Sequence, residues 1–290
     1  MTILLTGCTG FLGSYLLKEF TKNDFKVIGI KRSSSNIYRI NKYMKKCKFY
    51  DIDKVTISEI FIKNDIDIVI NTVTNYGRNC EKTSSIVDTN LMFSLKLIEE
   101  SINNKIKCFI NTDTLLERDL NAYALSKAQV IDWMKLLSNL DIKMVNIKIE
   151  HMYGPFDDEN KFVYWLINQL KSNVKEINLT SGMQKRDFIY IDDIVNAYMI
   201  IIKNTNKFNS FEEFEVGSGK PVEVKEFINL IYEEIDKKQK ISTKLNFGVI
   251  PYRENENMNM EVNISKLVSL EWKNNTTLKS GINAILKEEN

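Results

Sequence analysis

The chain has 290 residues, enough for one large domain or two closely joined domains with a substantial core. Its 43% hydrophobic and 27% charged residues are ordinary for a globular protein, and a net charge of +2 gives no reason to expect nucleic acid or a membrane surface as a partner. Four scattered cysteines without a C-x-x-C pair argue against a disulfide framework or a zinc site, and the single histidine, His151, excludes a histidine-rich metal site.

Short apolar strands alternate with helix-length segments through the first two thirds of the chain. The first apolar run is too short for a signal peptide and no later run reaches the length of a membrane span, so we expect a cytoplasmic protein. Strands are expected at residues 3–5, 26–30, 66–71, 107–111 and 143–149, and helices at 13–21, 86–103 and 122–140. This alternation predicts a Rossmann-type α/β fold, a doubly wound parallel sheet with helices on both faces.

The pattern loosens after Gly154-Pro155. Residues 162–170 and 222–235 still have helical spacing, whereas the segments between them read as polar and irregular. A strand near residues 213–216 is expected to rejoin the first sheet. We therefore predict a nucleotide-binding core at residues 1–150 and a smaller substrate-binding lobe at residues 151–290.

A glycine motif lies between the first expected strand and the first expected helix. Residues 6–13 read Thr-Gly-Cys-Thr-Gly-Phe-Leu-Gly, a G-x-x-G-x-x-G pattern. Glycines at a strand–helix junction permit a tight turn and close approach of a pyrophosphate to the helix N-terminus. The candidate cofactor-binding residues here are Gly7, Gly10, Phe11, Leu12 and Gly13.

Two cations and a run of serines follow the second expected strand, where an NAD site usually has an acidic residue for the ribose 2′-hydroxyl. Lys31, Arg32 and Ser33 suit a 2′-phosphate instead, through charge-assisted hydrogen bonds. This composition favours NADP(H) over NAD(H). Asp51 and Ile52, at the end of the next candidate strand, are expected near the adenine.

Tyr123 and Lys127 form a Y-x-x-x-K pattern on an expected helix, and this spacing puts both side chains on one face. A free tyrosine has a pKa near 10, and a neighbouring cation favours the phenolate. A shift of about 3 units corresponds to about 4 kcal/mol. We therefore expect Lys127 to lower the pKa of Tyr123 and Tyr123 to act as the general acid–base.

The glycine motif together with Tyr123-x-x-x-Lys127 resembles the extended short-chain dehydrogenases that modify nucleotide sugars. The resemblance runs through nearly the whole chain. Further matching segments are Asn90, 153–155, 186–193, 217–221, Tyr252-Arg253 with Glu256, and 270–272.

This resemblance implies roles for individual residues. Thr112 would hydrogen-bond the substrate oxygen while Tyr123 transfers the proton, and Lys127 would also hold the nicotinamide ribose. Asn90 would belong to the cofactor site. Arg186 and Arg253 would grip the substrate diphosphate, a role that suits guanidinium geometry, and Glu256 lies in the same matching segment.

The segment after Thr112 reduces the number of reactions that the chain could catalyse. Sugar-nucleotide 4,6-dehydratases carry Asp-Glu there, whereas this chain has Asp113 followed by Thr114, which argues against dehydration because one carboxyl is missing. Asp113 is instead a candidate ligand of sugar hydroxyls.

The basic turn favours an NADPH-dependent 4-ketoreductase of a CDP-, dTDP- or GDP-linked deoxysugar, and residues 110–114 and 151–155 resemble the CDP-abequose and paratose synthase type. A C4 epimerase that retains NAD is the alternative, and a non-catalytic NADP(H)-binding regulator is a distant one.

Two departures from these relatives concern the sugar pocket. Only ten residues separate Thr112 from Tyr123, fewer than relatives usually have, which predicts a more open pocket. His151 stands where relatives often carry a substrate-facing Asn, so it is a candidate substrate ligand. The helices at 86–103 and 122–140 resemble those that pair across a dimer in relatives, so a homodimer is expected.

Overall fold

The computed structural model describes residues 1–254 and 256–288. These residues form two compact units, each built from two stretches of chain. Unit 1 comprises residues 1–149 and 197–215, and unit 2 comprises the described part of residues 150–196 and 216–290.

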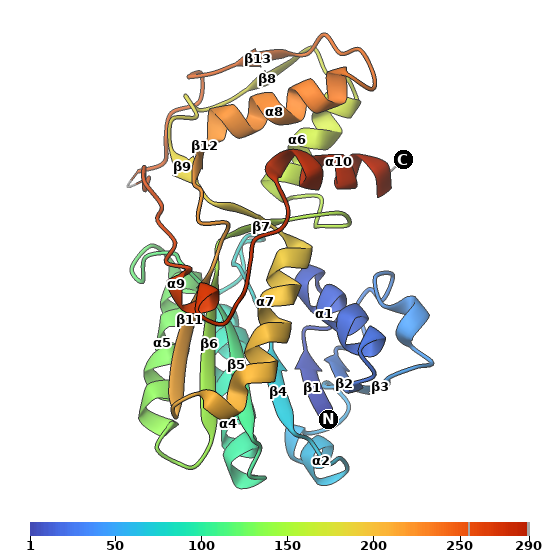
Figure 1. The fold of residues 1–290 in the computed structure, drawn as a ribbon, viewed down its shortest axis with the longest axis vertical. Coiled ribbons are helices and arrows are strands. Elements are labelled where there is room, and N and C mark those ends of the chain that lie inside the picture. The colour runs from blue at the N-terminus through green and yellow to red at the C-terminus, as the bar shows by residue number, and fades with distance from the viewer. Residues whose placement is uncertain (255, 289–290) are drawn as a thin grey trace. The chain divides into compact units, whose positions relative to one another are not determined.

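Unit 1 is organised around a seven-stranded parallel sheet (Figure 1). The strand order is β11-β6-β5-β4-β1-β2-β3, with the sequence-distant β11 at one edge. The strands are β1 Thr2–Thr6, β2 Lys26–Lys31, β3 Lys48–Asp51, β4 Ile68–Asn71, β5 Cys108–Thr114, β6 Lys143–Ile149 and β11 Phe211–Val216. Together with its flanking helices, this sheet confirms the predicted Rossmann-type α/β fold.

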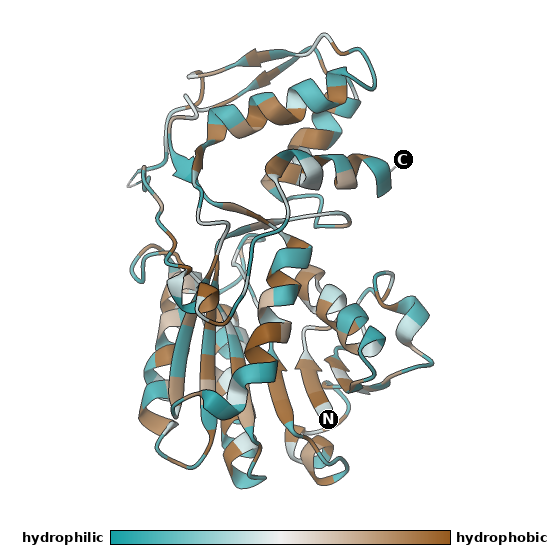
Figure 2. Ribbon diagram, in the orientation of Figure 1, coloured by the Kyte–Doolittle hydropathy of each residue, from teal (hydrophilic) through white to brown (hydrophobic). Residues whose placement is uncertain are grey.

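Helices cover this sheet with apolar side chains. The helices of the first stretch are α1 Phe11–Lys22, α2 Ile57–Ile62, α3 Thr83–Val87, α4 Phe93–Asn103 and α5 Ala122–Leu137. Short 3-10 turns lie at η1 Asn41–Tyr43 in this stretch and at η3 Thr205–Lys207 in the second stretch. Helices α2, α4 and α5 contribute Ile60, Phe61, Leu97, Ile98, Val130 and Met134 to one buried cluster with the strands. Hydrophobic residues accordingly dominate strands such as β1 and β4, while the helices alternate between apolar and polar faces (Figure 2).

Several predicted elements of unit 1 have other bounds than expected, and two of these differences bear on the site. Strand β5 does not end at residue 111, because its pairing with β6 continues to Thr114↔Ile149. The expected helix at 86–103 is interrupted by a π-helical turn, η2, at Asp88–Met92. Such turns often occur at functional sites, and this one contains the fully buried Asn90.

Among its described residues, unit 2 contains short strand pairs, four complete helices and the first part of a fifth. Its strands are β7 His151–Tyr153, β8 Glu176–Asn178, β9 Lys185–Arg186, β10 Phe188–Tyr190, β12 Val222–Glu223 and β13 Lys244–Asn246. They pair as β10-β7, β12-β9 and β13-β8. The helices lying wholly in this unit are α6 Phe162–Lys171, α8 Val224–Asp236, α9 Ser265–Val268 and α10 Leu278–Glu288.

The expectation of irregular structure between residues 170 and 222 is wrong. Helix α7, Ile191–Asn204, occupies 14 residues of that segment and passes from unit 2 into unit 1. Its buried residues Ile194, Tyr198 and Ile201 recur at helical spacing. Two acidic residues in the first turn made this segment look polar in the sequence. In the part of the chain that the structure describes, no helix has the length and apolarity to span a bilayer.

Candidate active site

The glycine loop joins β1 to α1 and is built by contacts that exclude side chains. Gly7 has a φ of 66°, the left-handed region, and a Cβ there would meet the backbone of Thr72. A Cβ on Gly13 would meet the carbonyl of Gly7. The first turn of α1, Phe11 onwards, has no side-chain cap, so its backbone N–H groups suit a phosphate.

The basic turn after β2 is partly neutralised by carboxylates. Lys31 is ion-paired with Asp51, which also lies 3.4 Å from the Lys54 ammonium. Ser33 donates its backbone N–H to Asp53 at 2.7 Å and its hydroxyl to the same carboxylate. Asp51 therefore binds lysines instead of standing free for an adenine.

Arg32 is the residue of this turn whose side chain remains available. Its guanidinium is exposed and has no ion pair among the described residues. Ile52, the other predicted adenine neighbour, packs partly buried against the core cluster. Asp53 was missed by the sequence analysis, although an acidic residue after the third strand was a visible signal.

Lys127 is buried with 1% of its surface exposed. Its ammonium donates to the carbonyl oxygen of Thr112 at 2.7 Å and to that of Val73 at 3.4 Å. Burial lowers the pKa of Lys127 to about 8, and the nearby Asp113 opposes this shift. Helix α5, which carries the lysine, begins with Asn121 accepting a hydrogen bond from the backbone of Ala124.

Tyr123 is half-buried beside a second aromatic ring. Burial raises the pKa of Tyr123 above its ordinary value, and the nearby Tyr76 and Asp113 raise it further. The expectation that Lys127 lowers this pKa is therefore wrong for this structure, because desolvation outweighs the opposing charge of Arg78 and the Lys127 ammonium is engaged by backbone carbonyls.

Two residues beside Tyr123 were not predicted, Tyr76 against its ring and Arg78 over the ring of Tyr76. The Tyr76 ring lies 5.1 Å from the Tyr123 ring, and the Arg78 guanidinium lies 4.8 Å above the Tyr76 ring. Arg78 lowers the pKa of Tyr123, against the dominant effect of burial. An aromatic and a cation just after a strand end were the available signal.

Two threonine hydroxyls lie at the carboxyl end of β5. The Thr112 hydroxyl is 2.7 Å from the phenol oxygen of Tyr198, a fully buried residue of α7 in unit 1. The side chain of Thr114 hydrogen-bonds Tyr123, and this contact lowers the pKa of the phenol. The structure thus gives Tyr123 a threonine neighbour other than the predicted Thr112.

Asn90 is fully used by protein contacts. Its amide donates to the carbonyl of Asn75 at 2.9 Å and to the hydroxyl of Ser126 at 3.0 Å. Its oxygen accepts the backbone N–H of Asn75 at 2.7 Å. Asn90, predicted to line the cofactor site, therefore ties the loop after β4 to α5.

Asp113 is 6% exposed and accepts a hydrogen bond from the Asn146 amide at 3.0 Å. A ligand of sugar hydroxyls would need an accessible carboxylate, so the predicted role of Asp113 as a sugar ligand does not fit its burial in this structure.

Four substrate ligands were predicted in unit 2. Two of them pair with each other, one pairs with a residue that was not predicted, and one has no ion pair among the described residues. Arg186 is ion-paired with Glu256 and also donates to the carbonyl of Asn257 at 2.7 Å. His151 is hydrogen-bonded through Nδ1 to the buried Glu150. Arg253 is exposed, with no ion pair among the described residues.

In chemical terms, unit 1 combines a glycine turn suited to a phosphate with a phenol, a buried ammonium and threonine hydroxyls at the end of β5. Ligands of open parallel sheets bind beyond the carboxyl ends of the strands, where these groups lie. No cluster of three or more His, Cys, Asp or Glu side chains that could hold a metal occurs in residues 1–254 or 256–288.

Comparison with known proteins places the chain in a family. The profile of the NAD dependent epimerase/dehydratase family matches residues 3–217. A CDP-abequose synthase from Salmonella typhimurium is 32% identical over 293 residues, covering 98% of this chain and 97% of that protein.

Solved structures agree on the fold. A UDP-glucose 4-epimerase from Thermotoga maritima superposes with a TM-score of 0.84 at 21% identity, covering 100% of both chains. A UDP-glucuronic acid 4-epimerase from Bacillus cereus, in complex with UDP-glucuronic acid and NAD, gives 0.83 at 22% identity, again over 100% of both chains. The chain therefore belongs to the NAD dependent epimerase/dehydratase family.

Proposed function

We propose that this member of the NAD dependent epimerase/dehydratase family is an NADPH-dependent reductase of the C4 keto group of a nucleotide-linked deoxysugar. The observation that carries the proposal is the end of β5, where Thr114 contacts Tyr123 and the carboxylate of Asp113 is buried. Elimination of water needs an accessible acid and an accessible base. Here one of the two carboxyls is buried, that of Asp113, and the other is replaced by the hydroxyl of Thr114. The likeness to a CDP-abequose synthase supports a CDP-linked sugar, with dTDP- and GDP-linked sugars as the other candidates.

In the proposed reaction, a bound NADPH supplies the hydride that reduces the C4 carbonyl. Tyr123 donates its phenolic proton to the oxygen of that carbonyl. Tyr198 can donate to Thr112 across their 2.7 Å contact, which leaves the Thr112 hydrogen for the same substrate oxygen. Lys127 holds the nicotinamide ribose, with its buried ammonium already oriented by the carbonyls of Thr112 and Val73.

The cofactor proposal fits the glycine loop and the basic turn. Gly7 and Gly13 permit the tightly packed turn from which the first turn of α1 would receive a pyrophosphate. Arg32 is the proposed ligand of the 2′-phosphate, because Lys31 and Ser33 are each bound to a carboxylate.

A C4 epimerase with retained NAD is the second candidate. The observation in its favour is Asp53, which accepts two hydrogen bonds from Ser33 where an NAD site would offer a carboxylate to the ribose. A regulator without turnover remains a third and distant candidate, and the retention of Thr112, Tyr123 and Lys127 argues against it.

We also propose roles in unit 2 and a location. Arg253 binds the substrate diphosphate, and Arg186 does so by exchanging Glu256 for a phosphate oxygen. His151 contacts the substrate with its ring oriented by Glu150. The four free cysteines support an environment that keeps thiols reduced, and we propose the cytoplasm.

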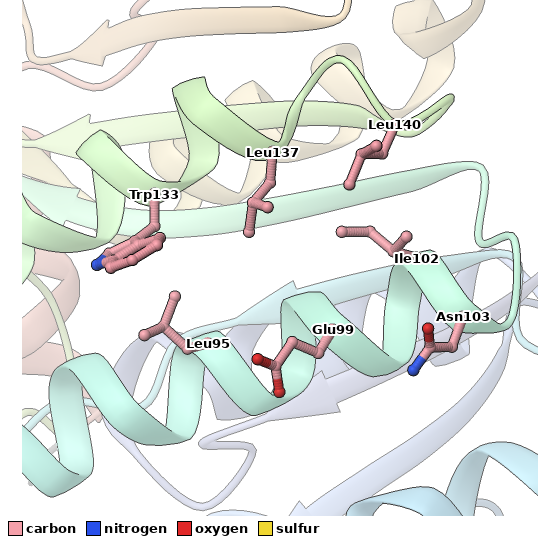
Figure 3. A pocket seen from close by; sticks show the side chains of 7 residues that line it. All are labelled: Leu95, Glu99, Ile102, Asn103, Trp133, Leu137 and Leu140. Carbon is pink, nitrogen blue, oxygen red and sulfur yellow. The ribbon is translucent and has the colours of Figure 1, made fainter.

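A homodimer through α4 and α5 completes the proposal. Figure 3 shows Trp133, Leu137 and Leu140 facing Leu95 and Ile102 across a shallow groove between these helices. Trp133 is 43% exposed and Leu140 52%, which favours burial against a second copy. Light scattering after size exclusion measures the mass directly, and a monomer at micromolar concentration would contradict the dimer.

The deciding experiment follows absorbance at 340 nm while CDP-, dTDP- and GDP-4-keto-deoxysugars are offered in turn, with NADH as the control. We expect stoichiometric NADPH consumption with one nucleotide. Absence of consumption, with tightly held NAD in the purified protein, would favour the epimerase.

A further inference from the structure

A row of hydrogen-bonded polar side chains crosses the middle of the sheet in unit 1. Thr6 donates to Asn71 at 2.7 Å, Asn71 to Asn111 at 3.3 Å, and Asn111 to Asn146 at 2.9 Å. These four residues, here named the amide ladder, lie directly opposite one another on β1, β4, β5 and β6. All four are fully buried.

The amide ladder has a direction. Each asparagine accepts through its side-chain oxygen and donates through its nitrogen, so the last nitrogen must find acceptors beyond the row. The Asn146 nitrogen donates to Asp113 at 3.0 Å and to Glu213 at 3.1 Å. A donor aimed at a buried carboxyl favours its ionised form, so the ladder stabilises an anion at Asp113.

The charged groups around Asp113 divide into two sets. Lys148 of β6 is paired with Glu213 of β11 at 2.9 Å, so these two charges balance each other at the sheet edge. The buried ammonium of Lys127, on α5, donates to the carbonyl of Thr112, the residue before Asp113. The negative charge of Asp113 also raises the pKa values of the phenols of Tyr123 and Tyr198.

Two opposite charges buried near each other require mutual compensation, because each alone would be expensive to remove from water. Burial raises the pKa of Asp113, while the Asn146 hydrogen bond and the Lys127 charge act in the opposite direction. For Lys127, burial lowers the pKa to about 8, and Asp113 is the charge that opposes it.

We propose that Asp113 is a positioning residue: fixed by the amide ladder, its carboxylate balances the buried charge of Lys127, whose ammonium the carbonyls of Thr112 and Val73 hold. The proposal rests on the ketoreductase function, because it assigns Lys127 a charge that the reaction uses. It replaces the sugar-binding role that the sequence suggested for Asp113.

The test compares Asp113→Asn with Glu213→Gln. Both variants remove one carboxylate that accepts from Asn146, but Glu213 balances Lys148 and not Lys127. The titration of Lys127 is followed by carbon-13 NMR of protein labelled at the lysine ε-carbon, with Lys127→Met to assign its signal. This readout needs no turnover, so it stands even where the ketoreductase proposal fails.

We expect Asp113→Asn to lower the pKa of Lys127 by at least one unit, about a tenfold weaker hold on the proton, and Glu213→Gln to leave it unchanged. In the ketoreductase assay, the kcat profile of Asp113→Asn should move to lower pH by the same amount with KM unchanged. An unmoved titration, equal shifts in both variants, or a rise in KM with an unmoved pH profile would overturn the proposal.

A second variant guards against misfolding of the first. Asn146→Ala removes the amide that holds Asp113 but keeps the carboxylate. We expect a downward shift of the Lys127 pKa smaller than that of Asp113→Asn, and no shift here would equally count against the ladder.

Discussion

Replacing Lys127 by methionine should make the protein more stable at neutral pH. The folded protein holds this lysine with a pKa of about 8 against an ordinary value of 10.5. That difference of about 2.5 units corresponds to about 3 kcal/mol by which the buried charge destabilises the fold. The attraction of Asp113 is already contained in this pKa. Methionine loses two hydrogen bonds to carbonyls, worth roughly 1 kcal/mol each, so a net gain of about 1–2 kcal/mol remains.

The stability advantage of Lys127→Met over the wild type should decrease as the pH rises. Below pH 8, Lys127 is protonated in both the folded and unfolded states, so the destabilisation is fully present. Between about pH 8 and 10.5 the folded state releases its proton first, and the wild type gains stability relative to Lys127→Met. The advantage of the variant should therefore vanish as the pH approaches 10.5.

Urea unfolding monitored by tryptophan fluorescence, repeated from pH 6.5 to 10.5, measures both proteins under the same conditions. Lys96→Met, at an exposed position of α4, controls for loss of a surface charge and should show a pH-independent difference. A Lys127→Met protein that is less stable than the wild type at pH 7, with a difference that stays constant across the range, would refute the reasoning.

Three further substitutions test the site. Tyr123→Phe should lower kcat by at least about a hundredfold while NADPH binding, measured by fluorescence titration, stays unchanged, since only the proton donor is lost; near-normal turnover would exclude Tyr123 as the acid. Arg32→Ala should raise KM for NADPH about tenfold or more without changing KM for NADH, because the 2′-phosphate loses its guanidinium, and equal effects on both cofactors would count against this contact. Tyr198→Phe should reduce the free energy of unfolding by about 1–2 kcal/mol, because the buried Thr112 hydroxyl loses a partner at 2.7 Å, and a urea midpoint equal to that of the wild type would contradict it.

The sequence by itself determined the parts of this protein that depend on local pattern. The alternation of apolar strands and helices predicted the sheet of unit 1, since strands buried on both faces read as short continuous apolar runs. Gly7 and Gly13 indicated the loop, because any larger residue at either position would place its Cβ against neighbouring backbone atoms. The four-residue spacing of Tyr123 and Lys127 placed both on α5.

Only the tertiary structure decided which polar groups meet, because their partners lie far away in the chain. Lys31 meets Asp51 and Arg186 meets Glu256, so two predicted phosphate-binding cations are already paired.

Burial, too, depends on the whole fold. Burial lowers the pKa of Lys127, and it removes the Asp113 carboxylate from the surface where a sugar ligand would have to lie. Asparagines in three apolar strands were visible in the sequence, but only the parallel register brings them into one hydrogen-bonded row. Desolvation and charge pairing act through space, so a local sequence pattern cannot specify them.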